Sequence, residues 1–75
     1  MRKMTQRDIN NFSFEFAKMH IGYTEKCGMA RALEIMGYIT ENTYLLLADN
    51  FEMQAYENIP VGVMTFKHIL ERGIR

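Results

Sequence analysis

The sequence predicts an all-α fold, a small helical hairpin or bundle of three to four helices. Three observations support this prediction. Apolar residues recur at spacings of three and four along most of the chain, threonine residues precede two of the periodic segments as helix caps, and no clear alternating strand pattern occurs. With 75 residues, of which 48% are hydrophobic, the chain is too apolar to be disordered. We therefore expect one small domain over residues 1–75.

The first expected helix begins after Thr5, whose hydroxyl can cap a helix that carries Asp8 in its first turn. From there two apolar stripes stay in phase across Gly22 and Gly28, which favours one long helix over about residues 6–36. Each interior glycine costs about 1 kcal/mol relative to alanine. A kink or break between the two glycines is therefore the alternative.

The rest of the chain is expected to form two shorter helices. Gly37 ends the first helix in a left-handed conformation, because glycine has no Cβ to clash there. Thr40 then caps a second helix over about residues 41–58, and the only proline of the chain stops it. A short last helix is expected over about residues 65–72. Whether residues 60–64 are helical or extended stays open.

A glycine turn followed by a capped helix is also the pattern of helix-turn-helix DNA-binding proteins. Between Ala32 and Phe66, however, the chain has five acidic residues and no lysine or arginine. Affinity for DNA comes chiefly from neutralised phosphates, so we expect this helix to pack rather than to read bases. The alternative function is a small helix-turn-helix-like transcriptional regulator with a basic N-terminal arm of Arg2, Lys3 and Arg7.

The candidates for chemistry are few. On a continuous helix Cys27 and His20 lie about 10 Å apart along the axis, too far for a thiolate–imidazole pair. Together with His68 they lack the close spacing of a zinc site. Phosphate-binding loops and nucleophile elbows are absent as well. We expect a non-enzyme with no cofactor and no metal. The single cysteine, with no signal peptide and no long apolar run, indicates a cytoplasmic protein that does not enter a membrane.

A first helix with two apolar stripes exposes more apolar surface than the later helices can cover, and an uncovered stripe marks an interface. We therefore expect a regulatory protein, an inhibitor or adaptor, that acts through protein–protein interaction as a homodimer or bound to a larger partner. The small size and the start at Met1 favour a complete bacterial or phage regulator. Methionines join the surface because they repack against varied shapes. The expected interface consists of Phe14, Ala17, Ile21, Gly28, Ala32, Ile35, Met29 and Met53.

Overall fold

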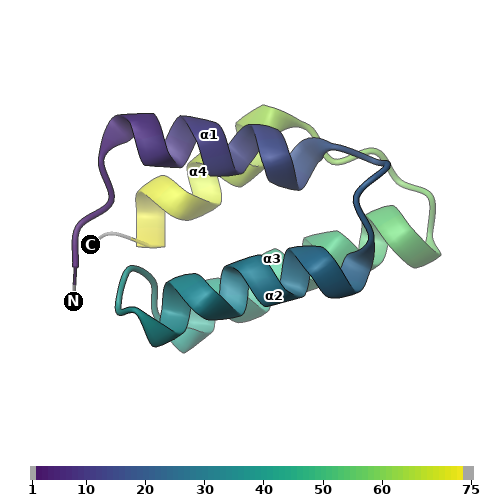
Figure 1. The fold of residues 1–75 in the computed structure, drawn as a ribbon. Helices are drawn as coiled ribbons and strands as arrows, with labels where there is room; N and C mark the ends of the chain where they lie inside the picture. The colour runs from purple at the N-terminus through teal and green to yellow at the C-terminus, as the bar shows by residue number, and fades with distance from the viewer. Residues whose placement is uncertain (1, 74–75) are drawn as a thin grey trace.

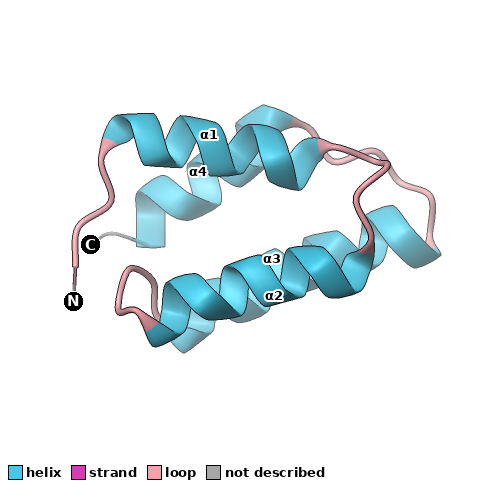
Figure 2. Ribbon diagram, in the orientation of Figure 1, coloured by secondary structure: helices cyan, strands magenta, loops and turns pink. Residues whose placement is uncertain are grey.

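Four helices make up most of the described chain, and they form two antiparallel pairs (Figure 1). A computed structural model describes residues 2–73. In chain order the helices are α1 (Gln6–Ala17), α2 (Tyr23–Ile35), α3 (Glu41–Tyr56) and α4 (Val63–Gly73). Helix α1 packs along α4, and α2 packs along α3. The described residues contain helices, turns and loops but no strand (Figure 2), so the prediction of a small all-α bundle is confirmed.

Threonine side chains cap two of the helices, as predicted. The hydroxyl of Thr5 accepts a hydrogen bond from the Asp8 N–H at 3.1 Å, and the Asp8 carboxylate accepts one from the Thr5 N–H at 3.4 Å. At the start of α3 the hydroxyl of Thr40 accepts from the Thr43 N–H at 3.3 Å. A cap of this kind stabilises a helix by about 1 kcal/mol, which explains why these two starts can be read from the sequence.

The predicted end of α2 is also confirmed. Gly37 has a φ of 85°, the left-handed conformation that glycine adopts without strain. Its N–H donates to the Glu34 carbonyl at 3.0 Å, and the N–H of Tyr38 donates to the Leu33 carbonyl at 2.9 Å. These two bonds form a Schellman motif and satisfy carbonyls that the end of the helix would otherwise leave without a donor.

The continuous helix expected over residues 6–36 is wrong. The alternative is right that the helix is broken, but wrong that the break lies between Gly22 and Gly28. Helix α1 ends at Ala17 and α2 begins at Tyr23. The break lies earlier in the chain than expected, because Gly22 is the N-cap of α2 and Gly28 lies inside that helix. Two helices at different positions in the bundle therefore replace the single long one, and the stripes that were in phase along the sequence no longer share a face.

A side-chain amide from α3 takes the place of a helical hydrogen bond at this break. In a continuous helix the carbonyl of Phe16 would accept from the N–H four residues later. Here it accepts from Gln54 Nε2 at 3.0 Å. The same Nε2 donates to the Val61 carbonyl at 3.4 Å, and Gln54 Oε1 accepts from Lys26 Nζ at 2.9 Å. Gln54 is 4% exposed, so one buried side chain joins α1, α2 and the segment between α3 and α4.

The centre of the core consists of three phenylalanine rings. Phe16, Phe51 and Phe66 come from α1, α3 and α4, and all three are fully buried. Their ring centroids lie 5.0 to 5.8 Å apart, with the Phe16 ring edge-on to the other two. Each such aromatic contact adds roughly 0.5–1.5 kcal/mol beyond area burial. Because α1 and α4 belong to one helix pair and α3 to the other, this cluster holds the two pairs together.

The boundaries of the last two helices differ slightly from the predicted ones. Helix α3 ends at Tyr56, close to the expected position. Helix α4 begins at Val63, two residues before the expected start, so Thr65 lies within the helix. The sequence left open whether residues 60–64 are helical. Residues 60–62 are not helical, and Val63 and Met64 are the first two residues of α4.

We predict that Gln54→Ala lowers the free energy of unfolding by about 3 kcal/mol, because it leaves Lys26 and two backbone carbonyls buried without their hydrogen-bond partner. Urea denaturation followed by circular dichroism measures this change. The matched control is Gln6→Ala, whose side chain makes only exposed hydrogen bonds, and which we expect to change stability by no more than about 0.5 kcal/mol. Equal effects of the two substitutions would contradict the role assigned to Gln54.

Candidate functional site

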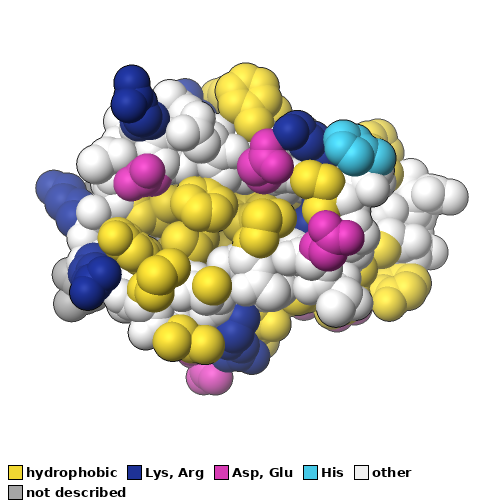
Figure 3. Space-filling model, viewed as in Figure 1, with side chains coloured by type: hydrophobic (Ala, Val, Ile, Leu, Met, Phe, Trp, Pro, Cys, Tyr) yellow, Lys and Arg dark blue, Asp and Glu magenta, His cyan; other side chains and the backbone are white. Residues whose placement is uncertain are grey.

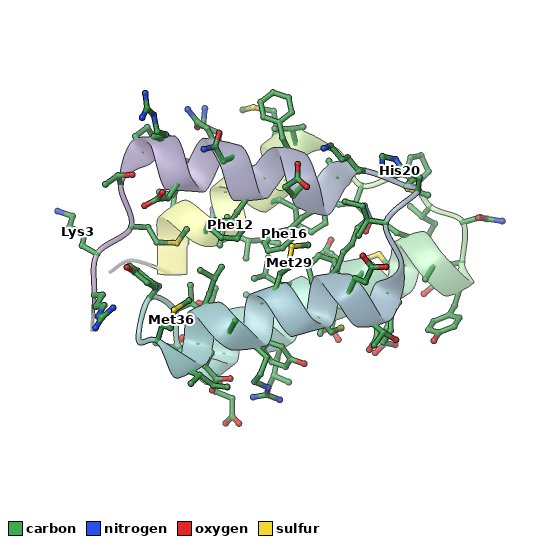
Figure 4. All side chains as sticks on the ribbon, in the orientation of Figure 1. Lys3, Phe12, Phe16, His20, Met29 and Met36 are labelled. Atoms are coloured by element: carbon green, nitrogen blue, oxygen red, sulfur yellow. The ribbon has the colours of Figure 1, made fainter. Side chains whose placement is uncertain are left out.

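The face formed by α1 and α2 carries an apolar cleft. Figure 3 shows hydrophobic side chains gathered over the middle of this face, with charged groups around their edge. Phe12 points from α1, and Met29 and Met36 point from the α2 side, toward the space between the two helices (Figure 4). We call this site the α1/α2 cleft. Its hollow has a volume of about 170 Å³ and is lined by Met4, Asp8, Phe12, Leu33, Met36 and Tyr38.

The cleft follows from how the helices pair. Because α1 packs on α4 and α2 on α3, the two helices that flank the cleft are not paired with each other. Met4 and Leu33 are buried and form its floor, whereas Met36 is 48% exposed at its edge. Phe12 and Met29 are half-buried and pack on the core. Methionine side chains are flexible, so this surface can adapt its shape to what it contacts.

The N-terminal segment is fixed at one end of the cleft. The backbone N–H of Arg2 donates to the Gly37 carbonyl at 2.6 Å, and its guanidinium lies over the Tyr38 ring at 5.8 Å from the centroid. Side chains of the predicted basic arm, Arg2, Lys3 and Arg7, are all exposed, and Lys3 points away from the helices (Figure 4). The structure therefore places three cations at one end of the molecule, but the backbone of the segment is not a free arm.

The eight residues of the predicted interface do not form one surface. Met29 lies beside the α1/α2 cleft, while Ala17 and Met53 are half-buried against the core. Phe14 is exposed on α1, and Ile21 is half-buried in the connection between α1 and α2. The outer face of α2 carries three exposed members of the predicted interface, Gly28, Ala32 and Ile35. The predicted interface is divided because the single long helix that would have carried most of it is broken.

A second, larger groove lies between α3 and α4. It has a volume of about 510 Å³ and mixes apolar Leu46 and Ile69 with polar side chains. His68 is exposed on its wall, together with Arg72 from the next turn of α4. No pattern in the sequence pointed to this groove. The remaining lining residues are Asn42, Thr43, Asn50, Thr65 and Gly73.

A buried lysine is the most unusual charged group of the fold. Lys26 is 2% exposed, and its Nζ lies 2.9 Å from Gln54 Oε1 and 6.0 Å from the centroid of the Phe51 ring. Burial lowers the pKa of Lys26, because the ammonium is removed from water. Sequence reasoning missed Lys26 and Gln54, since charged and amide side chains are usually exposed. The available signal was helical spacing, which places Lys26 on the inner face of α2 with Ala30.

Cys27 is half-buried and packs against the core as a small apolar contact. It also affects a neighbour on the preceding turn of α2. A side-chain hydrogen bond with Cys27, followed by burial and by negative charge on Cys27 and Glu52, raises the pKa of Tyr23 to about 12. The Tyr23 ring lies 5.4 Å from that of Tyr56, centroid to centroid, so this residue also ties the start of α2 to the end of α3.

Among residues 2–73, no three His, Cys, Asp or Glu side chains are grouped in a way that would hold a metal ion. Within the same residues, every helix is too short or too polar to span a bilayer. No protein-family model, curated protein or solved structure matches this chain. Inferences about its function therefore rest on the residues and the geometry described above.

We predict that the stability of the protein rises as the pH increases toward 10. The folded-state pKa of Lys26 lies below its ordinary value of 10.5. Between these two values the unfolded chain binds more protons than the folded one, so raising the pH favours the folded state. Tyr23 has the opposite effect from pH 10.0 to about 12, since its folded-state pKa is raised.

Urea denaturation at a series of pH values between 7 and 10 measures this dependence, with Lys26→Met as the comparison. The substitution should remove most of the increase in the free energy of unfolding at alkaline pH. A slope that is the same in both proteins would show that Lys26 is not the group responsible.

Proposed function

We propose that this chain is a small, non-enzymatic regulatory or adaptor protein of the cytoplasm that binds a protein partner through the α1/α2 cleft. The observation that carries the proposal is a concave apolar surface, about 170 Å³ in volume, with Met36 about half exposed at its edge. An apolar hollow rimmed by charged groups is typical of a protein-binding surface. The cytoplasmic setting is supported by the single cysteine of the chain.

The size of the hollow favours one kind of occupant. Sites for small organic ligands usually measure about 300–1,000 Å³, which is well above the volume of this cleft. A protein helix that lies along the groove needs less depth, because it inserts individual apolar side chains and covers the rest of the surface. Phe12 and Met36 then provide contacts from the two sides of the groove. The proposed partner therefore presents the apolar face of a helix.

That helix belongs either to a second copy of this chain or to a larger protein. Ile35, adjacent to Met36 at the end of α2, is 78% exposed and available to a second copy. A homodimer through a symmetric contact would use the same surface on both subunits. Light scattering over a concentration series separates the two cases, because only self-association doubles the mass of 8.8 kDa.

We predict that Met36→Gln weakens association at least tenfold while it leaves the helix content unchanged. The substitution keeps the length of the side chain, adds a polar amide to the rim of the cleft and removes apolar area from the contact. Met64→Gln is the matched control, because Met64 is similarly exposed on α4, outside the cleft.

Light scattering and site-specific photocrosslinking measure the effect. A photoreactive amino acid at position 36, but not at position 64, should crosslink the second copy or the larger partner in cells that produce the protein. Equal crosslinking from the two positions, or equal weakening by the two substitutions, would contradict a role for the cleft.

The alternative function is DNA binding through Arg2, Lys3 and Arg7, which are all exposed. We predict no retardation of duplex DNA in a gel-shift assay at low salt. Helix α3, which would be the second helix of a helix-turn-helix, carries three acidic residues and no basic one, so it cannot neutralise phosphates. Binding that weakens steeply as salt rises, and that is lost when Lys3 and Arg7 become Gln, would overturn the proposal in favour of this alternative.

A further inference from the structure

The charge of Lys26 has no counter-ion within the described part of the chain. Its Nζ bonds to a neutral amide oxygen at 2.9 Å, and no carboxylate of residues 2–73 lies within 4.0 Å of it. Burial lowers the pKa of Lys26, and no neighbouring acidic group raises it again. A buried ammonium is costly unless an anion or several hydrogen bonds compensate it. A lysine has three N–H donors, and the Gln54 oxygen uses one of them.

The position of Lys26 along its helix adds to the local positive potential. It is the fourth residue of α2, close to the N-terminus, where the helix dipole and the free N–H groups favour negative charge. The N-cap, Gly22, has no side chain that could accept from these N–H groups. Glu25 provides one acidic group in the first turn, but its side chain is exposed.

A hollow of about 110 Å³ lies beside this lysine. Its wall on one side is the connection between α1 and α2, and on the other side it is the second half of α3. Its exposed lining is about equally polar and apolar, and Lys26 and Gln54 are among its polar groups. The lining residues are Met19, Ile21, Gly22, Tyr23, Lys26, Phe51, Gln54 and Ala55.

The geometry points to a carboxylate-binding site in this hollow, with the ammonium of Lys26 as the group that binds the anion. Gln54 cannot take over that role, because its Nε2 already donates to the carbonyls of Phe16 and Val61. The volume suits a carboxylate with a short apolar tail, since the partly exposed side chains of Met19 and Ile21 offer apolar contacts in the same hollow. It is well below the size of sites for larger organic ligands.

Two sources can supply this chemistry: a short free carboxylic acid, or the side chain of Asp or Glu in a bound protein. The site shares no lining residue with the α1/α2 cleft. The inference therefore does not depend on the proposed function of that cleft, and either can fail without the other.

The test is a titration of the 15N-labelled protein with sodium propionate, followed by NMR at constant ionic strength. We expect saturable shifts of the amide signals of residues 19–26 and 51–55. Propionamide, which has the same shape without the charge, is the matched control and should produce no saturable shifts. A blocked tripeptide, acetyl-Ala-Glu-Ala-amide, and its Gln counterpart form the second arm, which represents a protein side chain.

Two substitutions connect the binding to the site. Lys26→Met removes the charge, and Ala55→Leu narrows the hollow from an exposed position on α3 and leaves the charge in place. We expect each to weaken binding at least tenfold. Because Ala55→Leu alters a surface position, it keeps the test decisive if Lys26→Met fails to fold.

The two arms identify the source of the carboxylate. Saturable binding of propionate alone indicates a free acid, and binding of the Glu peptide but not of its Gln counterpart indicates a protein side chain. Either result supports the site if Ala55→Leu weakens it. The inference is overturned if neither probe binds, if the neutral controls bind equally well, or if both substitutions leave the affinity unchanged.

Discussion

The amide of Gln54 is the constraint on which the arrangement of the helices depends. It donates to the Phe16 carbonyl, so the backbone can leave the helix after Ala17 without a buried carbonyl that lacks a donor. It also donates to the Val61 carbonyl before α4 and accepts from Lys26 on α2. These bonds connect both helix pairs beside the three-ring core. In so small a protein the loss of a single junction of this kind is a large fraction of the total stability.

Breaking the first helix changes which surfaces the protein presents. Helix α1 becomes free to pack on α4, and α2 packs on α3. The side chains of Phe12, Met29 and Met36 then meet from opposite sides of a cleft (Figure 4). The same break places the connection between α1 and α2 next to Lys26. This connection forms one wall of the hollow of about 110 Å³ beside that lysine. Both candidate sites are thus consequences of one departure from regular helical structure.

The two sites differ in chemistry because their electrostatic environments differ. The α1/α2 cleft is lined almost entirely by apolar side chains, and its one acidic member, Asp8, also serves as a cap at the start of α1. Contacts there depend on apolar area and shape, so salt should affect them little. At Lys26 the positive end of α2 coincides with a buried ammonium that has no counter-ion among residues 2–73. Interactions with an anion are stronger in such a place than at an exposed lysine.

The amino-acid sequence by itself determined the all-α class, the capped starts at Thr5 and Thr40 and the glycine end at Gly37, because periodicity and capping act over a few neighbouring residues. The interface predicted from the sequence is divided among several surfaces, and of its eight residues Met29 lies beside the α1/α2 cleft. The place of the break, the burial of Lys26 and the division of the predicted interface were decided only in the tertiary structure. They depend on contacts between residues far apart in the chain, such as the hydrogen bond from Gln54 to the Phe16 carbonyl across 38 positions, which no local pattern records.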